Sequence, residues 1–401
     1  MLARRLLLLF VPLGALATLA PAQQPAHPDK LAAIKPAMQK FVDSGDLSGA
    51  VTLVGRKGGV IEHDAVGYRD LAAKDAMRKD TLFRIASMTK PITAIGIMIL
   101  VDEGKLSPDD DVAKHLPEFA GQMLAPGKAG AELRKPARPI KLRDLLTHTA
   151  GLANYPKELA DVYSKRDRTL AETTKAVAAL PLHFEPGTKW SYSNSGIDIL
   201  GRVIEVASGQ SYESFLQQRV FDPLGMTDTA FYPTAEQFKR IARTYDKDKA
   251  GKLVSGPFGL VGLPANPKHP IPAGGLVSSA ADLAKLYRMM LHKGEWDGRR
   301  ILSEKAVAEM TRTQTGDIKT GFVDGMSFGY GWAVVKEPKG VTAALSPGTY
   351  GHGGAFGTQA WIDPKRDLFV VLMIQRTGLP NADASPMRQA LQELAVAAVK
   401  E

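Results

Sequence analysis

The sequence predicts an α/β fold of the α+β type: a mainly antiparallel sheet flanked by helices, with a helical subdomain inserted. Two observations support this prediction. Strand-like runs lie near both ends of the chain, at residues 49–67 and 330–374, and the segments between them have mainly helical periodicity. Strands from both termini that enclose a helical middle are typical of one sheet built from the two ends of the chain.

The N-terminus has the parts of a secretory signal peptide, at residues 1–22. Arg4-Arg5 precede an apolar stretch at 6–19, and Ala20-Pro21-Ala22 fits a small-residue cleavage site. The apolar stretch is short for a membrane span. We therefore expect cleavage after Ala22 and a secreted or periplasmic protein without a stable membrane span. The chain stays basic without these two arginines, because its formal net charge is +9.

The remainder, residues 30–401, is expected to form one domain, with a sheet part at about 30–82 plus 280–401 and a helical part at about 83–279. The predicted helices are 31–41, 142–146, 169–180, 196–207, 212–220, 280–291 and 387–399. The predicted strands are 49–54, 60–67, 330–335, 359–362 and 368–374. Residues 245–275 are rich in Gly and Pro, which predicts a long irregular segment.

The composition is that of an ordinary globular protein, with 44% apolar and 23% charged residues. The sequence has no cysteine, which excludes disulfides, thiol catalysis, cysteine-based zinc sites and a lipoprotein anchor. Its eight histidines are scattered without a metal-binding pair, so we expect no metal and no cofactor. Lysine and arginine are dispersed rather than gathered in a stripe, which argues against nucleic acid as a partner.

The stretch Ser87-Met88-Thr89-Lys90 opens a long apolar helix that Gly104 ends. This spacing puts Ser87 at the helix N-terminus and Lys90 one turn further on the same face. A serine hydroxyl is a weak nucleophile until a base takes its proton, and a partly unprotonated amine can be that base. The helix N-terminus adds positive charge where an oxyanion would form. The same spacing also occurs by chance in exposed surface pairs, so its context decides.

A second serine motif, Gly325-Met326-Ser327-Phe328-Gly329, matches the G-x-S-x-G nucleophile elbow. That elbow needs a strand before the serine and a helix after it. Here an irregular segment precedes the motif and a strand at 330–335 follows it, so we predict a loop and no catalytic role for Ser327. Gly351-His352-Gly353-Gly354 likewise precedes a strand, so it is not a dinucleotide-binding motif.

Three segments together, Ser87-x-x-Lys90, Tyr192-Ser193-Asn194 and His352-Gly353-Gly354, resemble the serine β-lactamase and penicillin-binding-protein superfamily, in its class C and esterase branch. The resemblance covers nearly the whole mature chain. Further similar stretches, in matching order, are residues 147–152, 184–187, 273–276 and 351–364. The resemblance implies a β-lactamase/transpeptidase-like catalytic domain with its site in the cleft between the sheet and the helical part.

By this resemblance Ser87 is the acylated nucleophile and Lys90 its partner base. Tyr192 resembles the phenol that shares protons with the lysine, as a phenolate beside an ammonium can do, and that protonates the leaving group. Asn194 would hydrogen-bond the substrate carbonyl. Considered singly, Tyr192 would be a packing residue and Asn194 an N-cap or turn residue. His148 is expected to be structural and to stabilise a turn.

The resemblance also implies a substrate-binding strand. The oxyanion hole would be formed by the backbone N–H groups of Ser87 and Ala355, and His352 would contact the substrate. Glycine at Gly353 and Gly354 would let an edge strand approach the substrate closely.

His352 also bears on the substrate class. In β-lactamases of this branch the matching position is lysine, followed by Thr and Gly, and that cation helps to hold the substrate carboxylate. Histidine is mostly neutral at pH 7, and Gly353 removes the threonine hydroxyl. A charge-assisted hydrogen bond is worth about 1.5–3 kcal/mol, so its loss should disfavour carboxylate substrates. Arg376 could supply the missing charge, and the sequence does not place it.

The expected function is therefore that of an exported serine hydrolase that acts through an acyl-enzyme on a small-molecule ester or amide, with carboxylic esters favoured. Two alternatives share this chemistry: a β-lactamase and a D-amino-acid peptidase of the cell wall. A third is a sensor that binds by becoming acylated and deacylates slowly. The sequence does not indicate an oligomeric state.

Overall fold

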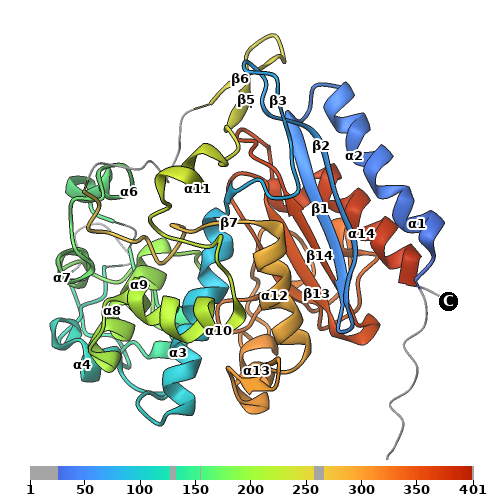
Figure 1. Ribbon diagram of the computed structural model, residues 1–401. Helices are drawn as coiled ribbons and strands as arrows, with labels where there is room; N and C mark the ends of the chain where they lie inside the picture. The colour runs from blue at the N-terminus through green and yellow to red at the C-terminus, as the bar shows by residue number, and fades with distance from the viewer. Residues whose placement is uncertain (1–25, 127–131, 154, 257–265, 400–401) are drawn as a thin grey trace, which may run out of the picture.

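The computed structural model describes residues 26–126, 132–153, 155–256 and 266–399, so the expected signal peptide lies outside the described residues. An antiparallel sheet in the order β10-β11-β12-β13-β14-β1-β2-β3 forms its centre (Figure 1). The strands are β1 (Gly49–Arg56), β2 (Gly59–Asp70), β3 (Asp75–Ala76), β10 (Met326–Phe328), β11 (Ala333–Val335), β12 (Tyr350–Gly353), β13 (Gln359–Asp363) and β14 (Leu368–Met373). The predicted fold class is confirmed, and the sheet joins both ends of the chain.

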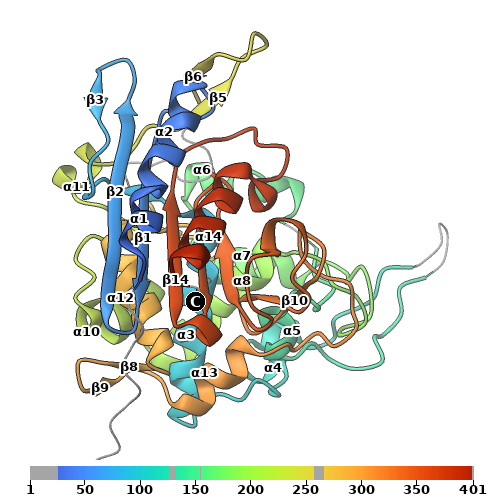
Figure 2. The ribbon, with the colours of Figure 1, turned by 90° about the vertical axis from the view of Figure 1, so that its right-hand side faces the viewer.

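Helices cover both faces of this sheet (Figures 1 and 2). On one face lie α1 (Pro28–Ala32), α2 (Ile34–Asp43) and α14 (Pro386–Val399), which Figure 2 shows in front of the strands. On the other face α12 (Ala280–Leu291) packs against β1 and β14, and α3 (Thr89–Asp102) lies further into the helical part. The sheet is therefore the middle of three layers.

The central strand β14 shows the consequence for the sequence. Phe369 and Val371 belong to the core shared with the helical part, whereas Val370 and Leu372 belong to the core beneath α2 and α14. Successive side chains of a strand point to opposite faces, and here both faces are covered. A strand buried on both sides is a continuous apolar run, which is the pattern that predicted it.

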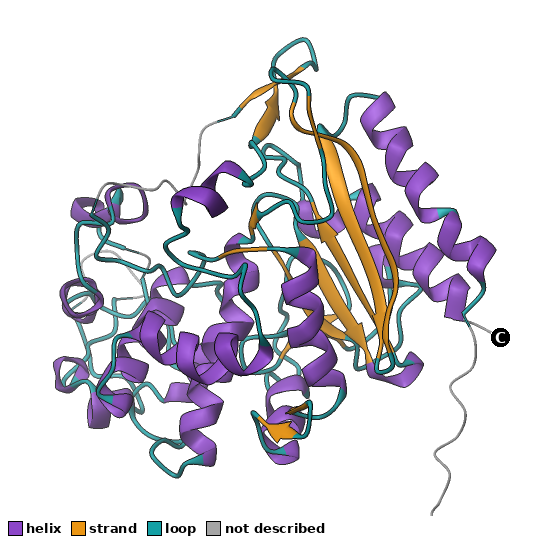
Figure 3. Ribbon diagram, in the orientation of Figure 1, coloured by secondary structure: helices purple, strands orange, loops and turns teal. Residues whose placement is uncertain are grey.

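The helical part is built around α3 and α8 (Asn194–Ser208), which pack against each other. Figure 3 shows the helices of this part gathered to one side of the strands. The remaining helices are α4 (Val112–His115), α5 (Leu142–Leu146), α6 (Val162–Lys165), α7 (Leu170–Ala178), α9 (Tyr212–Leu216), α10 (Asp222–Leu224), α11 (Ala235–Lys239) and α13 (Glu304–Thr311). Small sheets pair β4 (Phe83–Arg84) with β7 (Val277–Ser278), β5 (Tyr245–Lys247) with β6 (Leu253–Ser255), and β8 (Glu295–Trp296) with β9 (Arg299–Arg300). α3 is buried from Thr89 to Leu100, which explains its apolar residues on all sides.

Some sequence predictions of local structure are wrong. Residues 245–275 were expected to be irregular, but β5 and β6 form a hairpin at 245–255, closed by an Asp248 side chain that accepts from Ala250 N–H and Lys252 N–H. Residues 266–275 contain no helix or strand, as expected, and 257–265 lie outside the described residues. Turn chemistry of this kind is local, and the surrounding Gly and Pro residues concealed it. The predicted helix at 212–220 changes into a π-helical turn after α9.

Ser327 lies in strand β10 and not in a loop. The strand is short, and the glycines on either side conceal it: Gly325 has a φ of 78°, typical of a turn. β10 is followed by β11 rather than by a helix, so this serine lacks the context of a nucleophile elbow. The Ser327 hydroxyl is buried and bonds with Thr315 Oγ1 at 2.9 Å.

β12 is not an edge strand, because β11 lies beside it and β10 forms the edge of the sheet beyond β11. β11, however, pairs only with Tyr350 and Gly351 of β12. His352 and Gly353 are paired on the other side alone, with β13. The end of this inner strand therefore has one open side, which is what a substrate-binding strand needs. No helix within the described ranges is long and apolar enough to span a bilayer.

Candidate active site

Ser87 lies in a short 3-10 turn, Ala86–Met88, that leads directly into α3. Ala86 has a φ of 43°, in the left-handed region that residues other than glycine rarely adopt, so the backbone turns sharply just before the serine. Ile85 N–H donates to Leu276 O at 3.0 Å and anchors this turn. Ser87 is partly exposed between buried neighbours, so it is accessible from the site.

Lys90 is fully buried, and its amine has three acceptors within hydrogen-bond distance. Nζ lies 3.0 Å from Ser87 Oγ, 2.8 Å from Asn194 Oδ1 and 2.7 Å from Ala273 O. Burial lowers the pKa of Lys90 from 10.5 to about 7, although the carboxylate of Asp198 acts in the opposite direction. Near neutral pH much of the amine is therefore unprotonated. Its two remaining N–H bonds then suffice for Asn194 and Ala273, and its lone pair can accept the serine proton.

Tyr192 lies against the same amine, with Lys90 Nζ 4.7 Å from the centre of its ring. Burial raises the pKa of Tyr192 well above its usual range, and a hydrogen bond with Ser87 only partly opposes this. The phenolate expected from the sequence is therefore unfavourable in the resting site. A neutral phenol beside a partly neutral amine leaves Lys90 as the base, and Tyr192 can give its proton only to a strongly basic atom such as a departing alkoxide.

Two buried histidines flank Tyr192, with ring centres 4.6 Å (His148) and 6.1 Å (His352) from its own. Burial and the charge of Lys90 lower the pKa of both, that of His352 to about 4, so both are neutral at pH 7. His352 Nδ1 lies 2.7 Å from Gly353 O, which can only accept, so Nδ1 carries the proton. Nε2 of His352 is then an acceptor and not a cationic donor.

His148 does more than the turn role expected of it. It has a φ of 60°, and its Nδ1 accepts from Ser193 N–H at 3.2 Å, which ties its turn to the segment that carries Tyr192. Its ring also packs against the phenol, with the two ring planes tilted by 38°. The two segments are far apart in the sequence, and no local pattern predicts that contact.

Asn194 is the first residue of α8, and the N-cap of this helix is Ser193, whose Oγ accepts from Gly196 N–H at 3.0 Å. The alternative interpretation of Asn194 as an N-cap is therefore wrong. Its side-chain oxygen accepts from Lys90, and no described residue accepts from its NH₂ group. That group remains for a substrate carbonyl.

The two N–H groups expected to form an oxyanion hole come from segments that Gly354 brings together. β12 packs against the turn of Ser87, and a Cβ on Gly354 would lie 2.2 Å from Thr358 Oγ1 and 2.5 Å from Ile85 O. Ala355 follows and is exposed. Within the described part of the chain nothing accepts from Ser87 N–H or Ala355 N–H, so both remain for a ligand oxygen.

Gly354→Ala is expected to lower kcat by about 10²-fold, the usual cost of one misplaced oxyanion donor. The added methyl would push the end of β12 away from Ile85 and move Ala355 N–H relative to Ser87. Gly104→Ala is the control, since a Cβ there meets no atom within 4 Å and only the backbone at φ 70° is strained. Steady-state kinetics and thermal melts of both variants test this. Equal kcat losses in the two would contradict the close-approach argument.

A carboxylate occupies the space beside Gly353. A Cβ on this residue would lie 2.2 Å from Asp383 Oδ1 and 2.4 Å from Gln359 Nε2, so a threonine has no room here. Asp383, His352, Gly353 and Arg388 line a small cavity. Asp383 is partly exposed, whereas Arg388 is buried and lies over the ring of Trp361. An incoming ligand therefore meets the carboxylate first.

Arg376 does not replace the missing lysine. Its side chain is buried, and Nη1 donates to Asp246 Oδ1 at 2.9 Å, so its charge is already paired. Arg376, whose position the sequence did not fix, is therefore not available to pair with a substrate carboxylate.

Aromatic rings form one wall of the site. Phe322, which is 46% exposed, contacts Tyr192 at 4.9 Å and Trp190 at 5.7 Å between ring centres, and Trp190 lies 5.2 Å from Phe328. An exposed phenylalanine over the expected proton donor suits an apolar substrate group. Phe322 was not predicted from the sequence, because an isolated aromatic residue in a loop carries no motif.

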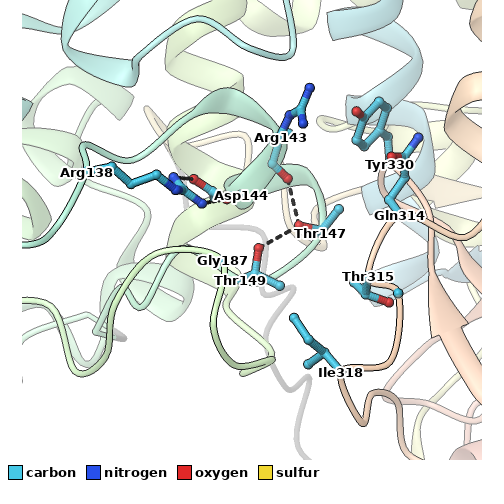
Figure 4. A pocket seen from close by; sticks show the side chains of 11 residues that line it. Arg138, Arg143, Asp144, Thr147, Thr149, Gly187, Gln314, Thr315, Ile318 and Tyr330 are labelled. Carbon is cyan, nitrogen blue, oxygen red and sulfur yellow. Dashed lines mark hydrogen bonds and ion pairs between the residues drawn. The ribbon is translucent and has the colours of Figure 1, made fainter.

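A separate cavity of about 330 Å³ lies beside α5 and the turn that follows it (Figure 4). Arg138 and Asp144 form a bidentate ion pair there, and Thr147 and Thr149 share a hydrogen bond of 2.8 Å. These polar groups are engaged with one another, so we assign this cavity no substrate. In the described residues, no group of three or more His, Asp or Glu side chains is placed to hold a metal ion.

Comparisons with known proteins show the family to which this chain belongs. The profile of a family described as Beta-lactamase matches residues 34–394. Esterase EstB of Burkholderia gladioli is 31% identical over 353 residues, which cover 82% of this chain and 86% of that protein. A putative D-alanyl-D-alanine carboxypeptidase of Escherichia coli K12 is 30% identical over 76% of this chain and 71% of its own. The structure of EstCE1, a hydrolase with promiscuous acyltransferase activity, superposes with a TM-score of 0.75 at 28% identity and covers 92% of this chain and 99% of its own.

Proposed function

This chain belongs to the β-lactamase family and is a serine hydrolase, and we propose that its preferred substrates are uncharged carboxylic esters, cleaved through an acyl-enzyme on Ser87. Two relatives described as an esterase and as a hydrolase with acyltransferase activity support this proposal. The observation that carries the proposal is the charge near the C-terminal end of β12, where His352 is neutral and Asp383 is a carboxylate.

Among the described residues, two arginines near that end of the site are poorly placed to pair with a penicillin or cephalosporin carboxylate: Arg376 is paired with Asp246, and Arg388 is buried. His352 is neutral because burial and Lys90 lower its pKa to about 4, and Asp383 fills the space beside Gly353 with negative charge. Loss of a charge-assisted hydrogen bond costs about 1.5–3 kcal/mol, or roughly tenfold to a hundredfold in binding. The nearby carboxylate adds repulsion. An uncharged ester meets neither penalty.

The proposed reaction uses the groups in the order in which they touch. Lys90 accepts the Ser87 proton as Oγ forms a bond to the acyl carbon, and the N–H groups of Ser87 and Ala355 receive the developing oxyanion. The ester C–O bond then breaks, Tyr192 gives its proton to the departing alkoxide, and the ammonium of Lys90 restores it. Water next attacks the acyl carbon, loses a proton to the same pair and releases the acid, while Ser87 Oγ regains its proton.

The aromatic wall favours an apolar acyl or alcohol group. Phe322 and Trp190 offer ring surface close to Tyr192, on the side where the leaving group takes its proton. p-Nitrophenyl butyrate, with a short apolar chain and an aromatic leaving group, is therefore the ester probe of choice.

At pH 7 we expect kcat/KM for p-nitrophenyl butyrate to exceed that for nitrocefin, because nitrocefin brings a carboxylate to Asp383. Asp383→Asn is the matched variant, because it keeps the side-chain shape and removes the charge. It should reduce the ratio of kcat/KM for p-nitrophenyl butyrate to kcat/KM for nitrocefin. Spectrophotometric assays of both substrates with both proteins test the proposal. A clear preference of the unmodified protein for nitrocefin would refute the ester proposal and leave the Ser87 mechanism standing.

A further inference from the structure

Asp198 is a buried carboxylate beside the site, and no motif in the sequence points to it. It lies on α8, one turn after Asn194, and only 1% of it is exposed. Its Oδ2 accepts from Tyr155 OH at 2.6 Å and Tyr163 OH at 2.5 Å, and its Oδ1 accepts from Ala273 N–H at 2.8 Å. Burial of a carboxylate costs free energy unless hydrogen bonds compensate for the lost water. Three hydrogen bonds compensate Asp198 and fix its position.

The Ala273 residue connects this carboxylate to the lysine. Its N–H donates to Asp198, and its carbonyl oxygen accepts from Lys90 Nζ at 2.7 Å. The backbone around it is tight: Ile271 has a φ of 60°, and a Cβ on Gly275 would lie 1.8 Å from a preceding carbonyl oxygen. A segment under such constraint needs an anchor, and Asp198 supplies one.

We propose that Asp198 is a positioning residue for catalysis: through the backbone of Ala273 it holds the carbonyl oxygen that keeps the Lys90 amine beside Ser87. Asp198 itself contacts neither Lys90 nor Ser87 through a hydrogen bond among the described residues. The proposal rests on the Ser87–Lys90 mechanism proposed above and adds a residue to it.

The charges around the two groups fix the sign of the expected effect. Lys90 is faced by His148, His352 and Tyr192, all neutral at pH 7 as described above. Asp198 is faced by Tyr155, Tyr163, Tyr212 and His269, with Arg166 behind His269. Burial and the Asp198 charge raise the pKa of Tyr155 and Tyr163, so these phenols stay neutral donors. The Asp198 charge raises the pKa of Lys90, against the stronger effect of burial.

Asp198→Asn is expected to move the acidic limb of the kcat/KM profile to lower pH. The amide keeps an acceptor for Ala273 N–H, and its NH₂ group can donate to the two phenol oxygens, but the charge is gone. Lys90 then loses its proton at lower pH. A shift of one unit from a limb near 7 would raise activity at pH 6, relative to the plateau, roughly fivefold. The plateau itself should fall, because a weaker base is less effective and its anchor is looser.

Asp282→Asn is the matched control. Asp282 is buried on α12 and also accepts from a backbone N–H, that of Asp228 at 2.7 Å, and from Thr229 Oγ1 at 3.0 Å. Its loss should lower stability without moving the limb. Tyr163→Phe is the second test variant, because it keeps the Asp198 charge but removes the hydrogen bond from Tyr163 OH. The less compensated carboxylate should then raise the pKa of Lys90 further and move the acidic limb to higher pH.

The pH profiles separate the outcomes. A limb for Asp198→Asn that stays in place or rises, or an equal shift in Asp282→Asn, would overturn the proposal. Where Asp198→Asn does not fold, Tyr163→Phe decides alone: a higher limb supports the proposal, and an unchanged or lower one overturns it. A wild-type protein acylated on Ser87 but without a limb near pH 7 would instead refute Lys90 as the base, and the role of Asp198 with it.

Discussion

Ser87→Ala is expected to lower kcat/KM for p-nitrophenyl butyrate by about 10⁴-fold or more and to abolish covalent labelling by a phosphonate ester. The serine hydroxyl is the partly exposed group at a strained turn, within hydrogen-bond distance of a buried amine that is partly neutral. Alanine removes the only atom that would carry the acyl group and leaves the turn intact. Assays and intact-protein mass spectrometry measure both effects.

Ser327→Ala is the matched control, since this serine is the one in the competing motif. Ser327 is 1% exposed and its hydroxyl bonds with Thr315, so the variant should keep its labelling and most of its activity. A Ser327 variant that lost labelling while the Ser87 variant kept it would contradict the proposed mechanism.

Lys90→Met is expected to lower kcat/KM on the order of 10³-fold, the usual range for loss of a general base. Methionine fills a similar volume but cannot accept the Ser87 proton. The wild-type kcat/KM should rise with pH through about 7, because the protonated amine below its pKa cannot act as a base. This limb should be absent in the variant, and pH–rate profiles of the two proteins test it.

Lys285→Met controls for loss of a paired lysine. Lys285 Nζ contacts Asp282 Oδ1 at 2.9 Å and also Gly225 O, and these contacts do not include Ser87, Tyr192 or Asn194. We expect no change in its pH profile. A Lys90 variant with the wild-type limb would show that another group titrates there.

The parts of the fold that the sequence predicted are those with local patterns. The apolar helix α3, the paired strands β1 and β2 and the doubly buried strand β14 follow from runs of apolar residues and the turns between them. β10 was missed, and β12 was expected only from the resemblance and as an edge strand, because both are short and rich in or flanked by glycine. Their pairing partners, and not their own residues, make them strands.

The site divides in the same way. Ser87 and Lys90 are one turn apart and could be placed from spacing alone, and resemblance brought in Tyr192, which the structure places over the lysine amine. Asp198 and Asp383 could not be found, because each acts on a residue far away in the sequence and lies in no motif. The role of a buried carboxylate in a helix can be inferred only from its hydrogen-bond partners, which the three-dimensional structure supplies.

The central claim is that Ser87 carries an acyl group that then turns over. The most direct measurement is rapid acid quenching of the reaction with p-nitrophenyl butyrate, followed by peptide mapping by mass spectrometry. The account predicts a butyryl group on the peptide that contains Ser87, formed at least as fast as kcat and lost as the substrate is consumed. A butyryl group on another residue, or turnover without any adduct, would contradict the account. An adduct on Ser87 that persists without turnover would make the protein a slowly deacylating sensor and not an esterase.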